Sequence, residues 1–217
     1  MMSEANFETM RAAMVSNQLR TSAVSDAQVV EAMRAVPREA FMPAGRTDLA
    51  YIDTPVAVGD GRSINPPLVT GRLLTALAPR AGERALVVGA ATGYAAAVLA
   101  ELGLVVTALE ENATLTAFAE GALATAGVDV VNGPLAAGVA EAAPYDVILI
   151  DGAVEQVSDA LKAQLADGGR MAGALVERGV TRLASGRKVG DSLVLADFAD
   201  SEAVALPGFA VPAGFVF

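Results

Sequence analysis

The stretch that decides the fold is Ala85-Leu-Val-Val-Gly-Ala-Ala-Thr-Gly-Tyr94, an apolar run followed by a loop of small residues and then by a helix-forming segment. Such a loop lets the backbone approach a ligand closely, and the free N–H groups at the start of the helix can bind its polar groups. Gly89 and Gly93 flank Ala91, which stands where a third glycine would serve. The pattern predicts either a ligand-binding loop of the dinucleotide type or a tight turn without a ligand.

Acidic residues follow two later apolar runs. Glu110 comes directly after the predicted strand 105–109, where an acid accepts hydrogen bonds from ribose hydroxyls. The alternative for Glu110 is a solvated carboxylate at the start of a helix. Asp151 follows the predicted strand 146–150 and so lies at the carboxyl edge of the sheet, where it either contacts a ligand or caps the loop. No further oxygen ligands can be assigned beside it, so no metal site is predicted.

Short apolar runs alternate with helix-forming segments from residue 84 onward. The predicted strands are 85–88, 105–109, 128–131 and 146–150, and the predicted helices are 94–102, 112–126 and 156–166. Short apolar strands separated by helices indicate parallel pairing with helices on both faces of the sheet. Three further predicted strands, 171–177, 181–188 and 192–198, are joined by tight turns. The fold class is therefore α/β, with a mostly parallel sheet that ends in an antiparallel hairpin.

The first third of the chain predicts a helical cap and a loop-rich arm. Asn6 is the expected N-cap of a first helix, whose apolar face is Phe7, Met10, Met14 and Leu19. A second helix follows the cap at Ser25–Asp26 and ends before Pro37, and a third opens at Pro66–Pro67. We expect one domain over residues 1–217, with the cap and arm at 1–80, the core at 81–200 and a tail at 201–217.

Composition excludes several kinds of chemistry. The chain has no cysteine and no histidine, which excludes disulfides, thiol nucleophiles, Ser-His triads and the commonest zinc sites. The net charge of −10 and the scattered basic residues argue against nucleic acid as a partner. Glycines interrupt the uncharged stretch 85–100, so no membrane span is predicted, and the N-terminus does not have the pattern of a signal peptide. A cytoplasmic location is the expectation.

Four blocks in the first third carry a resemblance to a known family. They are Met14-Val-Ser-Asn-Gln-Leu-Arg20, Val36-Pro-Arg-Glu-Ala-Phe-Met-Pro43, Ala50-Tyr-Ile-Asp53 and Gly61-Arg-Ser-Ile-Asn-Pro-Pro67. Together with residues 89–102 and 145–169, they resemble the protein-L-isoaspartate O-methyltransferases. The resemblance implies a Rossmann-like methyltransferase fold with a mostly parallel seven-stranded sheet. It also implies S-adenosyl-L-methionine as the methyl donor and the α-carboxylate of isoaspartyl residues in damaged proteins as the acceptor. We expect a monomer or dimer.

The same resemblance implies the site residues. The cofactor-binding set is Gly89, Ala91, Gly93, Tyr94, Glu110, Gly133 and Asp151. The catalytic pair is Asn65, which replaces a serine of the family, and Ser63, which stands where the family has a threonine. The chain departs from the family pattern at three further places: Val87 replaces an acid, Pro134 replaces another, and Asp151 replaces a threonine.

These departures leave two other functions open. One is a methyltransferase-fold protein that binds or regulates without catalysis, and the other is a methyltransferase for a small carboxylic acid. The tail, residues 206–217, is expected either to reach the acceptor pocket or to cover an apolar edge of the sheet.

Overall fold

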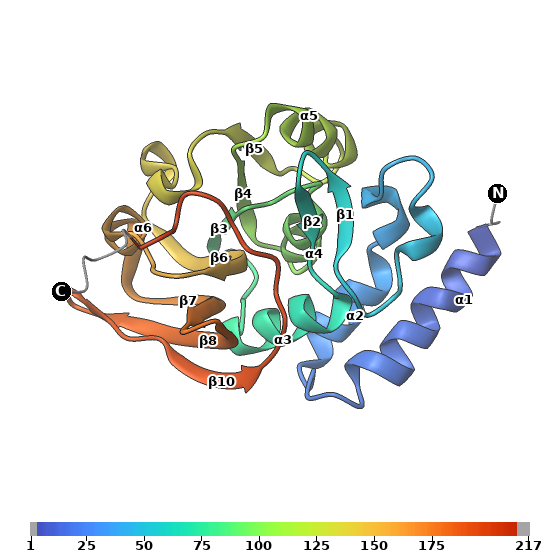
Figure 1. Ribbon diagram of the computed structural model, residues 1–217, viewed down its shortest axis with the longest axis horizontal. Helices are drawn as coiled ribbons and strands as arrows, with labels where there is room; N and C mark the ends of the chain where they lie inside the picture. Colours follow the sequence, from blue (N-terminus) through green and yellow to red (C-terminus); the bar gives the residue numbers. More distant parts are fainter. Residues whose placement is uncertain (1–3, 212–217) are drawn as a thin grey trace.

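A twisted central sheet dominates the computed structural model, which describes residues 4–211 (Figure 1). Its strands are β3 (Arg84–Val88), β4 (Val105–Glu110), β5 (Asp129–Asn132), β6 (Tyr145–Val154), β7 (Leu165–Glu177), β8 (Val180–Val189), β9 (Ser192–Leu193) and β10 (Ala196–Asp200). The strand order is β10-β8-β7-β6-β3-β4-β5, and the short β9 pairs with β8. The pairs β3–β4, β4–β5, β3–β6 and β6–β7 are parallel, whereas β7–β8 and β8–β10 are antiparallel. The predicted α/β fold with a C-terminal antiparallel hairpin is confirmed.

Side chains alternate across the strands, and each face of the sheet has its own apolar core. Val87 and its neighbours on one face pack with residues of α2 (Ala27–Ala35), α3 (Pro67–Leu77), α4 (Tyr94–Glu101) and α5 (Ala113–Ala122). On the other face, Leu86 and Val88 share a cluster with Leu161 of α6 (Asp159–Gln164). Leu206 and Phe209 from the C-terminal segment belong to this second cluster. The segment around residues 206–209 is therefore part of the core.

The N-terminal third forms helices and an arm. Helix α1 (Glu4–Met14) runs into a π-helical turn, Val15–Leu19, and its apolar side chains pack against the first core. The arm ends in a hairpin of β1 (Val56–Gly59) and β2 (Arg62–Ile64). The prediction that Asn6 caps the first helix was wrong, because α1 has already begun at Glu4.

Local capping signals place most helix starts correctly. The Asp26 carboxylate accepts hydrogen bonds from the backbone N–H groups of Gln28 and Val29, at 2.8 and 3.2 Å, and so begins α2. The Asn112 side chain accepts from Leu115 at 3.0 Å and begins α5. Helix α3 opens at Pro67, where a missing N–H costs nothing.

The predicted helix 156–166 is shorter than expected. It begins at Asp159, because the Ser158 hydroxyl accepts a hydrogen bond from the backbone N–H of Leu161 at 3.2 Å. Before it, β6 runs to Val154, beyond its expected end, because Ala153 and Val154 pair with Ala174 and Leu175 of β7. Leu165 and Ala166, the last two residues of the predicted helix, belong instead to β7, where Leu165 pairs with Tyr145 of β6.

After β10 the chain turns back and crosses the carboxyl ends of β6 and β3 (Figure 1). The rest of the predicted tail, residues 212–217, lies outside the described residues. Within residues 4–211, no helix combines the length and apolar character that a membrane span requires.

Candidate active site

The loop after β3 has the backbone conformation of a glycine-rich ligand loop. Gly89 and Gly93 have φ values of +79° and +98°, and Ala91 between them has φ +49° although it carries a side chain. A left-handed conformation costs a residue with a Cβ about 1–2 kcal/mol. The Ala91 N–H donates to Glu110 Oε2 at 2.8 Å, and this bond holds the strained residue in place.

We expect Ala91→Gly to raise the free energy of unfolding by about 0.5–1 kcal/mol, because relief of the left-handed strain exceeds the greater entropy of glycine in the unfolded chain. Urea-induced unfolding measures this difference. Ala117→Gly, on the exposed side of α5, is the matched control and should lower stability by about 0.5–1 kcal/mol. A destabilised Ala91→Gly variant would mean that the loop is not strained.

Gly93 serves packing. A Cβ at this position would lie 2.7 Å from Leu123 Cδ1, so the glycine lets α4 start against the end of α5. Tyr94 follows it and is buried at the start of α4. Burial raises the pKa of the Tyr94 hydroxyl to about 12. The structure therefore places Gly93 and Tyr94 in the wall behind the loop.

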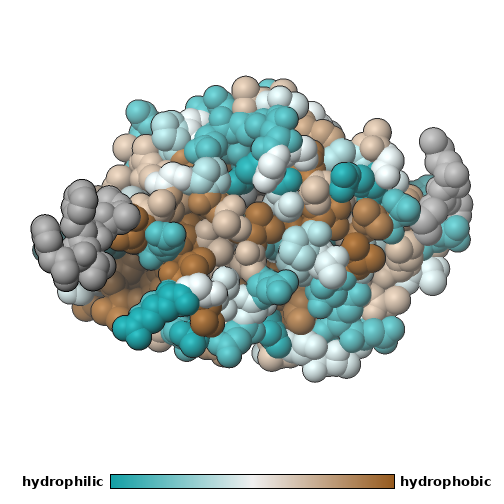
Figure 2. Space-filling view, in the orientation of Figure 1, coloured by the Kyte–Doolittle hydropathy of each residue, from teal (hydrophilic) through white to brown (hydrophobic). Residues whose placement is uncertain are grey.

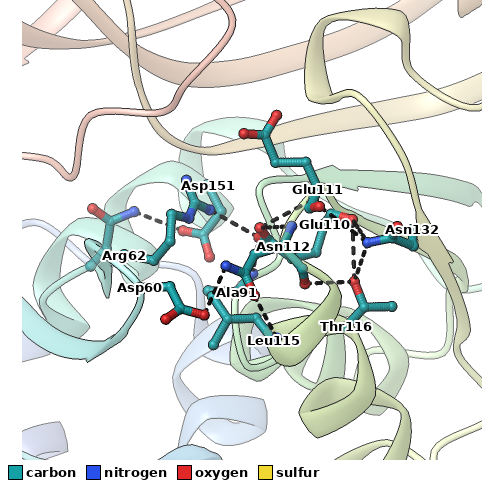
Figure 3. Close-up of polar contacts among 11 residues, drawn as sticks. Asp60, Arg62, Ala91, Glu110, Glu111, Asn112, Leu115, Thr116, Asn132 and Asp151 are labelled. Atoms are coloured by element: carbon teal, nitrogen blue, oxygen red, sulfur yellow. Dashed lines mark hydrogen bonds and ion pairs between the residues drawn. The ribbon is translucent and has the colours of Figure 1, made fainter.

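Glu110, at the end of β4, is the most highly connected side chain of the site (Figure 3). Its Oε2 accepts from Ala91 N at 2.8 Å and from Arg62 Nη2 at 2.9 Å, and its Oε1 accepts from the backbone N–H groups of Glu111 and Asn112, both at 3.1 Å. The side chain is fully buried. A carboxylate offers about four acceptor positions, so all of them are engaged within the protein. A ligand hydroxyl could bind Glu110 only by replacing one of these four donors.

Arg62 is a site residue that the sequence interpretation missed. It lies on β2, is 6% exposed and faces Glu110 across the crevice. Its Nε and Nη1 atoms are buried without a hydrogen-bond partner among residues 4–211. The only sequence signal was its position beside Ser63, in a block that resembles the family's substrate arm.

Asn65 and Asp151 meet near the carboxyl end of β6, a contact that the sequence analysis did not predict. Asn65 Nδ2 donates to Asp151 Oδ1 at 2.8 Å, and Asn65 itself is buried. Burial raises the pKa of the Asp151 carboxyl, although the hydrogen bond from Asn65 opposes the shift. The pair thus combines an oriented amide with a partly desolvated carboxyl group.

Arg38 holds the backbone of Asn65 in place and is a second site residue that the sequence interpretation missed. It is 1% exposed, and its guanidinium donates to the backbone oxygens of Ala50 at 2.7 Å and Asn65 at 2.6 Å. The guanidinium also lies 4.5 Å from the centre of the Tyr94 ring, within cation–π distance. Arg38 therefore joins the arm that carries Asn65 to the helix that follows the glycine loop.

Two predicted residues lie at the margin of the site. Ser63 sits on β2 between Arg62 and Ile64, and alternation along the strand puts its side chain on the opposite face of the hairpin from Arg62. Gly133 follows β5, and its N–H donates to the Glu110 backbone oxygen at 3.1 Å. Gly133 is thus beside Glu110, whereas Ser63 is turned away from it.

Leu206 occupies the space in front of the glycine loop. A Cβ on Gly89 would lie 2.7 Å from Leu206 Cδ2, and one on Gly152 would lie 2.5 Å from Leu206 Cγ. The two glycines therefore leave a cradle, and this leucine side chain fills it. Sequence periodicity gave no sign of this contact.

Comparison with known sequences identifies the family. The profile of the protein-L-isoaspartate(D-aspartate) O-methyltransferase family matches residues 9–204. The chain belongs to this family. It is 46% identical over 163 residues to a protein-L-isoaspartate O-methyltransferase of Methylorubrum extorquens (strain PA1), an alignment that covers 74% of this chain and 72% of that protein. An enzyme of the same name from Rhodopseudomonas palustris (strain HaA2) is 41% identical over 169 residues, with coverages of 76% and 69%.

Solved structures of family members share the fold. One protein-L-isoaspartate O-methyltransferase superposes with a TM-score of 0.81 at 24% identity, over 91% of this chain and 66% of its own. Another, from Plasmodium falciparum and in complex with S-adenosyl-L-homocysteine, gives a TM-score of 0.78 at 20% identity, over 90% of this chain and 97% of its own. At these identities the likeness establishes the fold alone, and the roles of the site residues must be argued from the geometry described above.

Proposed function

We propose that this chain transfers the methyl group of S-adenosyl-L-methionine to the α-carboxylate of L-isoaspartyl residues in proteins, a protein-repair reaction. The observation that carries the proposal is family membership over residues 9–204, which include both the glycine loop and the arm with Asn65. Relatives that are 41–46% identical bear the name of this enzyme.

The residues around the loop fit an adenosyl donor on one condition. Gly89 and Gly152 leave a cradle without side chains of their own, and Glu110 supplies a buried acid at its rim. The cradle admits a ligand once the Leu206 side chain is withdrawn. Gly89, Ala91 and Glu110 would then hold the donor, with Gly133 and Asp151 at its margins. When bound, the donor supplies an electrophilic methyl group.

The chain's own contribution is positioning. A carboxylate acceptor has an ordinary pKa near 4 and is ionised at pH 7, so it needs no general base, and a chain without histidine suffices. Alignment of two reactants in a dry site lowers a barrier by about 7–11 kcal/mol. Asn65 is placed to orient the acceptor through its side-chain amide, and Arg38 fixes the backbone of Asn65.

Methyl transfer to a matched peptide pair tests the proposal. The purified chain is incubated with S-adenosyl-L-methionine labelled in its methyl group and with either an isoaspartyl peptide or its aspartyl twin. We expect label in the isoaspartyl peptide alone, released as methanol in mild alkali because the product is an ester. Asn65→Leu should abolish transfer, whereas Asn65→Ser should retain it. Label in neither peptide, with protein in stoichiometric amount, contradicts the proposal.

One observation favours a second candidate, a family member that binds or regulates without catalysis. The cradle is filled by Leu206, and the acceptor positions of Glu110 are all engaged. If both contacts are permanent, no donor binds. Calorimetric titration with the donor separates the candidates, because the catalytic protein must produce a binding isotherm.

A further inference from the structure

The segment that fills the cradle is residues 203–209, which we call the strap. It is attached to the carboxyl end of β6 like a short extra strand: Ala153 N donates to Val204 O at 2.7 Å, and Leu206 N donates to Ala153 O at 2.9 Å. Ala205 thereby pairs with Ala153 in a parallel bridge. The strap lies on the face of the molecule that is turned toward the viewer in Figure 1. Figure 2 shows apolar residues across the middle of the same face.

Two side chains anchor the strap. Phe209 is 2% exposed within the second apolar core, and Leu206 is 8% exposed in the cradle of Gly89 and Gly152. Either glycine with a Cβ would collide with Leu206, so cradle and leucine are complementary in shape. A donor held against the backbone of Gly89 and Gly152 would need the space that Leu206 fills.

The strap also engages the amide of the proposed acceptor site. Val204 N donates to Asn65 Oδ1 at 2.9 Å, while Asn65 Nδ2 donates to Asp151. Both ends of the Asn65 side chain are therefore occupied while the strap is in place. Release of the strap frees the cradle and the Asn65 oxygen in one movement.

Apart from its two anchoring side chains, its bridge to β6 and its bond to Asn65, few contacts hold the strap. Ala205, Pro207 and Gly208 are exposed, and its backbone makes one bridge to β6. A cavity of about 540 Å³ lies between the strap and the hairpin, and its lining includes Arg62, Glu111 and Asn112. A cavity of this size is in the range of small-molecule sites, so a ligand has an entrance beside Leu206.

We propose that the strap is an internal competitor for the donor: it closes the cofactor crevice in the free protein, and donor binding expels Leu206 from the cradle. The inference rests on the proposed function, since it concerns the donor site of that reaction. It predicts that the observed affinity for the donor is the intrinsic affinity reduced by the fraction of molecules with the strap released.

Calorimetric titration with S-adenosyl-L-homocysteine tests the competition in three full-length proteins. Leu206→Ala empties the cradle and should lower the apparent Kd by about tenfold or more relative to the wild type. Val204→Ala is the matched control, because it keeps the backbone bonds of the strap, and of Val204 only the carbonyl is among the atoms nearest to Gly152. Its Kd should stay within about twofold of the wild-type value. Thermal unfolding verifies that each variant is folded.

Hydrogen exchange in the wild-type protein gives a second readout that needs no variant. The Leu206 amide is hydrogen-bonded to Ala153 in the free protein and should exchange at least about tenfold faster at saturating S-adenosyl-L-homocysteine. Equal Kd values for the wild type and Leu206→Ala, with the Leu206 amide still protected in the complex, overturn the competition and leave donor binding intact. No binding to either protein overturns the competition and the proposed function together.

Discussion

Replacement of Glu110 by leucine is expected to lower the free energy of unfolding by about 3–5 kcal/mol. The variant leaves the Arg62 guanidinium buried without its carboxylate, at a position where two of its nitrogens already have no partner among residues 4–211. It also leaves the N–H groups of Ala91, Glu111 and Asn112 without their acceptor. Denaturant-induced unfolding followed by circular dichroism measures the loss.

Removal of the other partner of the ion pair, Arg62, should lower the free energy of unfolding by less. In Arg62→Leu the Glu110 carboxylate keeps its three backbone donors, so we expect a loss of about 1–3 kcal/mol. The double variant should be more stable than the sum of the two single losses predicts, because no unpaired buried cation remains. A Glu110→Leu variant within 1 kcal/mol of the wild type, or strictly additive losses, would show that the two side chains are not coupled.

Arg38→Met should lower the free energy of unfolding by about 2–4 kcal/mol. Methionine fills a similar volume but donates no hydrogen bond, so the backbone oxygens of Ala50 and Asn65 lose their buried partner and the Tyr94 ring loses a cation. Methyl transfer should fall as well, by about tenfold or more, since misplacement of a positioning group by even 1 Å is costly. Unfolding and peptide methylation are measured on the same preparation.

Arg46→Met is the control for this prediction, because Arg46 is exposed in the same arm. Its stability should remain within about 0.5 kcal/mol of the wild type. If Arg38→Met behaves like Arg46→Met, then Arg38 does not hold the arm in place, and the position of Asn65 must have another cause.

Sequence periodicity sufficed for the sheet, because its information is local. The strand β3 and the loop after it follow from a buried apolar run and its small residues, and the start of α2 follows from the Asp26 cap. The last two residues of the predicted helix 156–166 were assigned wrongly because they belong to β7, whose Leu165 pairs with Tyr145 of β6. Tertiary pairing overrode the local helical preference.

The sequence predicted those site residues whose position depends only on the strand topology. Glu110 ends β4 and Asp151 lies near the carboxyl end of the parallel strand β6, and such strand ends meet at one edge, so their placement on one side of the sheet followed from the strand assignments. Arg62 and Leu206 enter the same crevice from the arm and from the end of the chain. No periodicity states which distant segment fills a cavity, so these two contacts required coordinates.

The strand order has a consequence for the behaviour of the protein at high concentration. The outermost strands, β10 and β5, carry Asp197, Asp200 and Asp129, and carboxylates along an open margin discourage two sheets from joining through backbone hydrogen bonds. With a net charge of −10, neighbouring copies also repel one another at long range. Both borders of the sheet are thus protected against the strand-by-strand accretion that turns folded proteins into insoluble fibres.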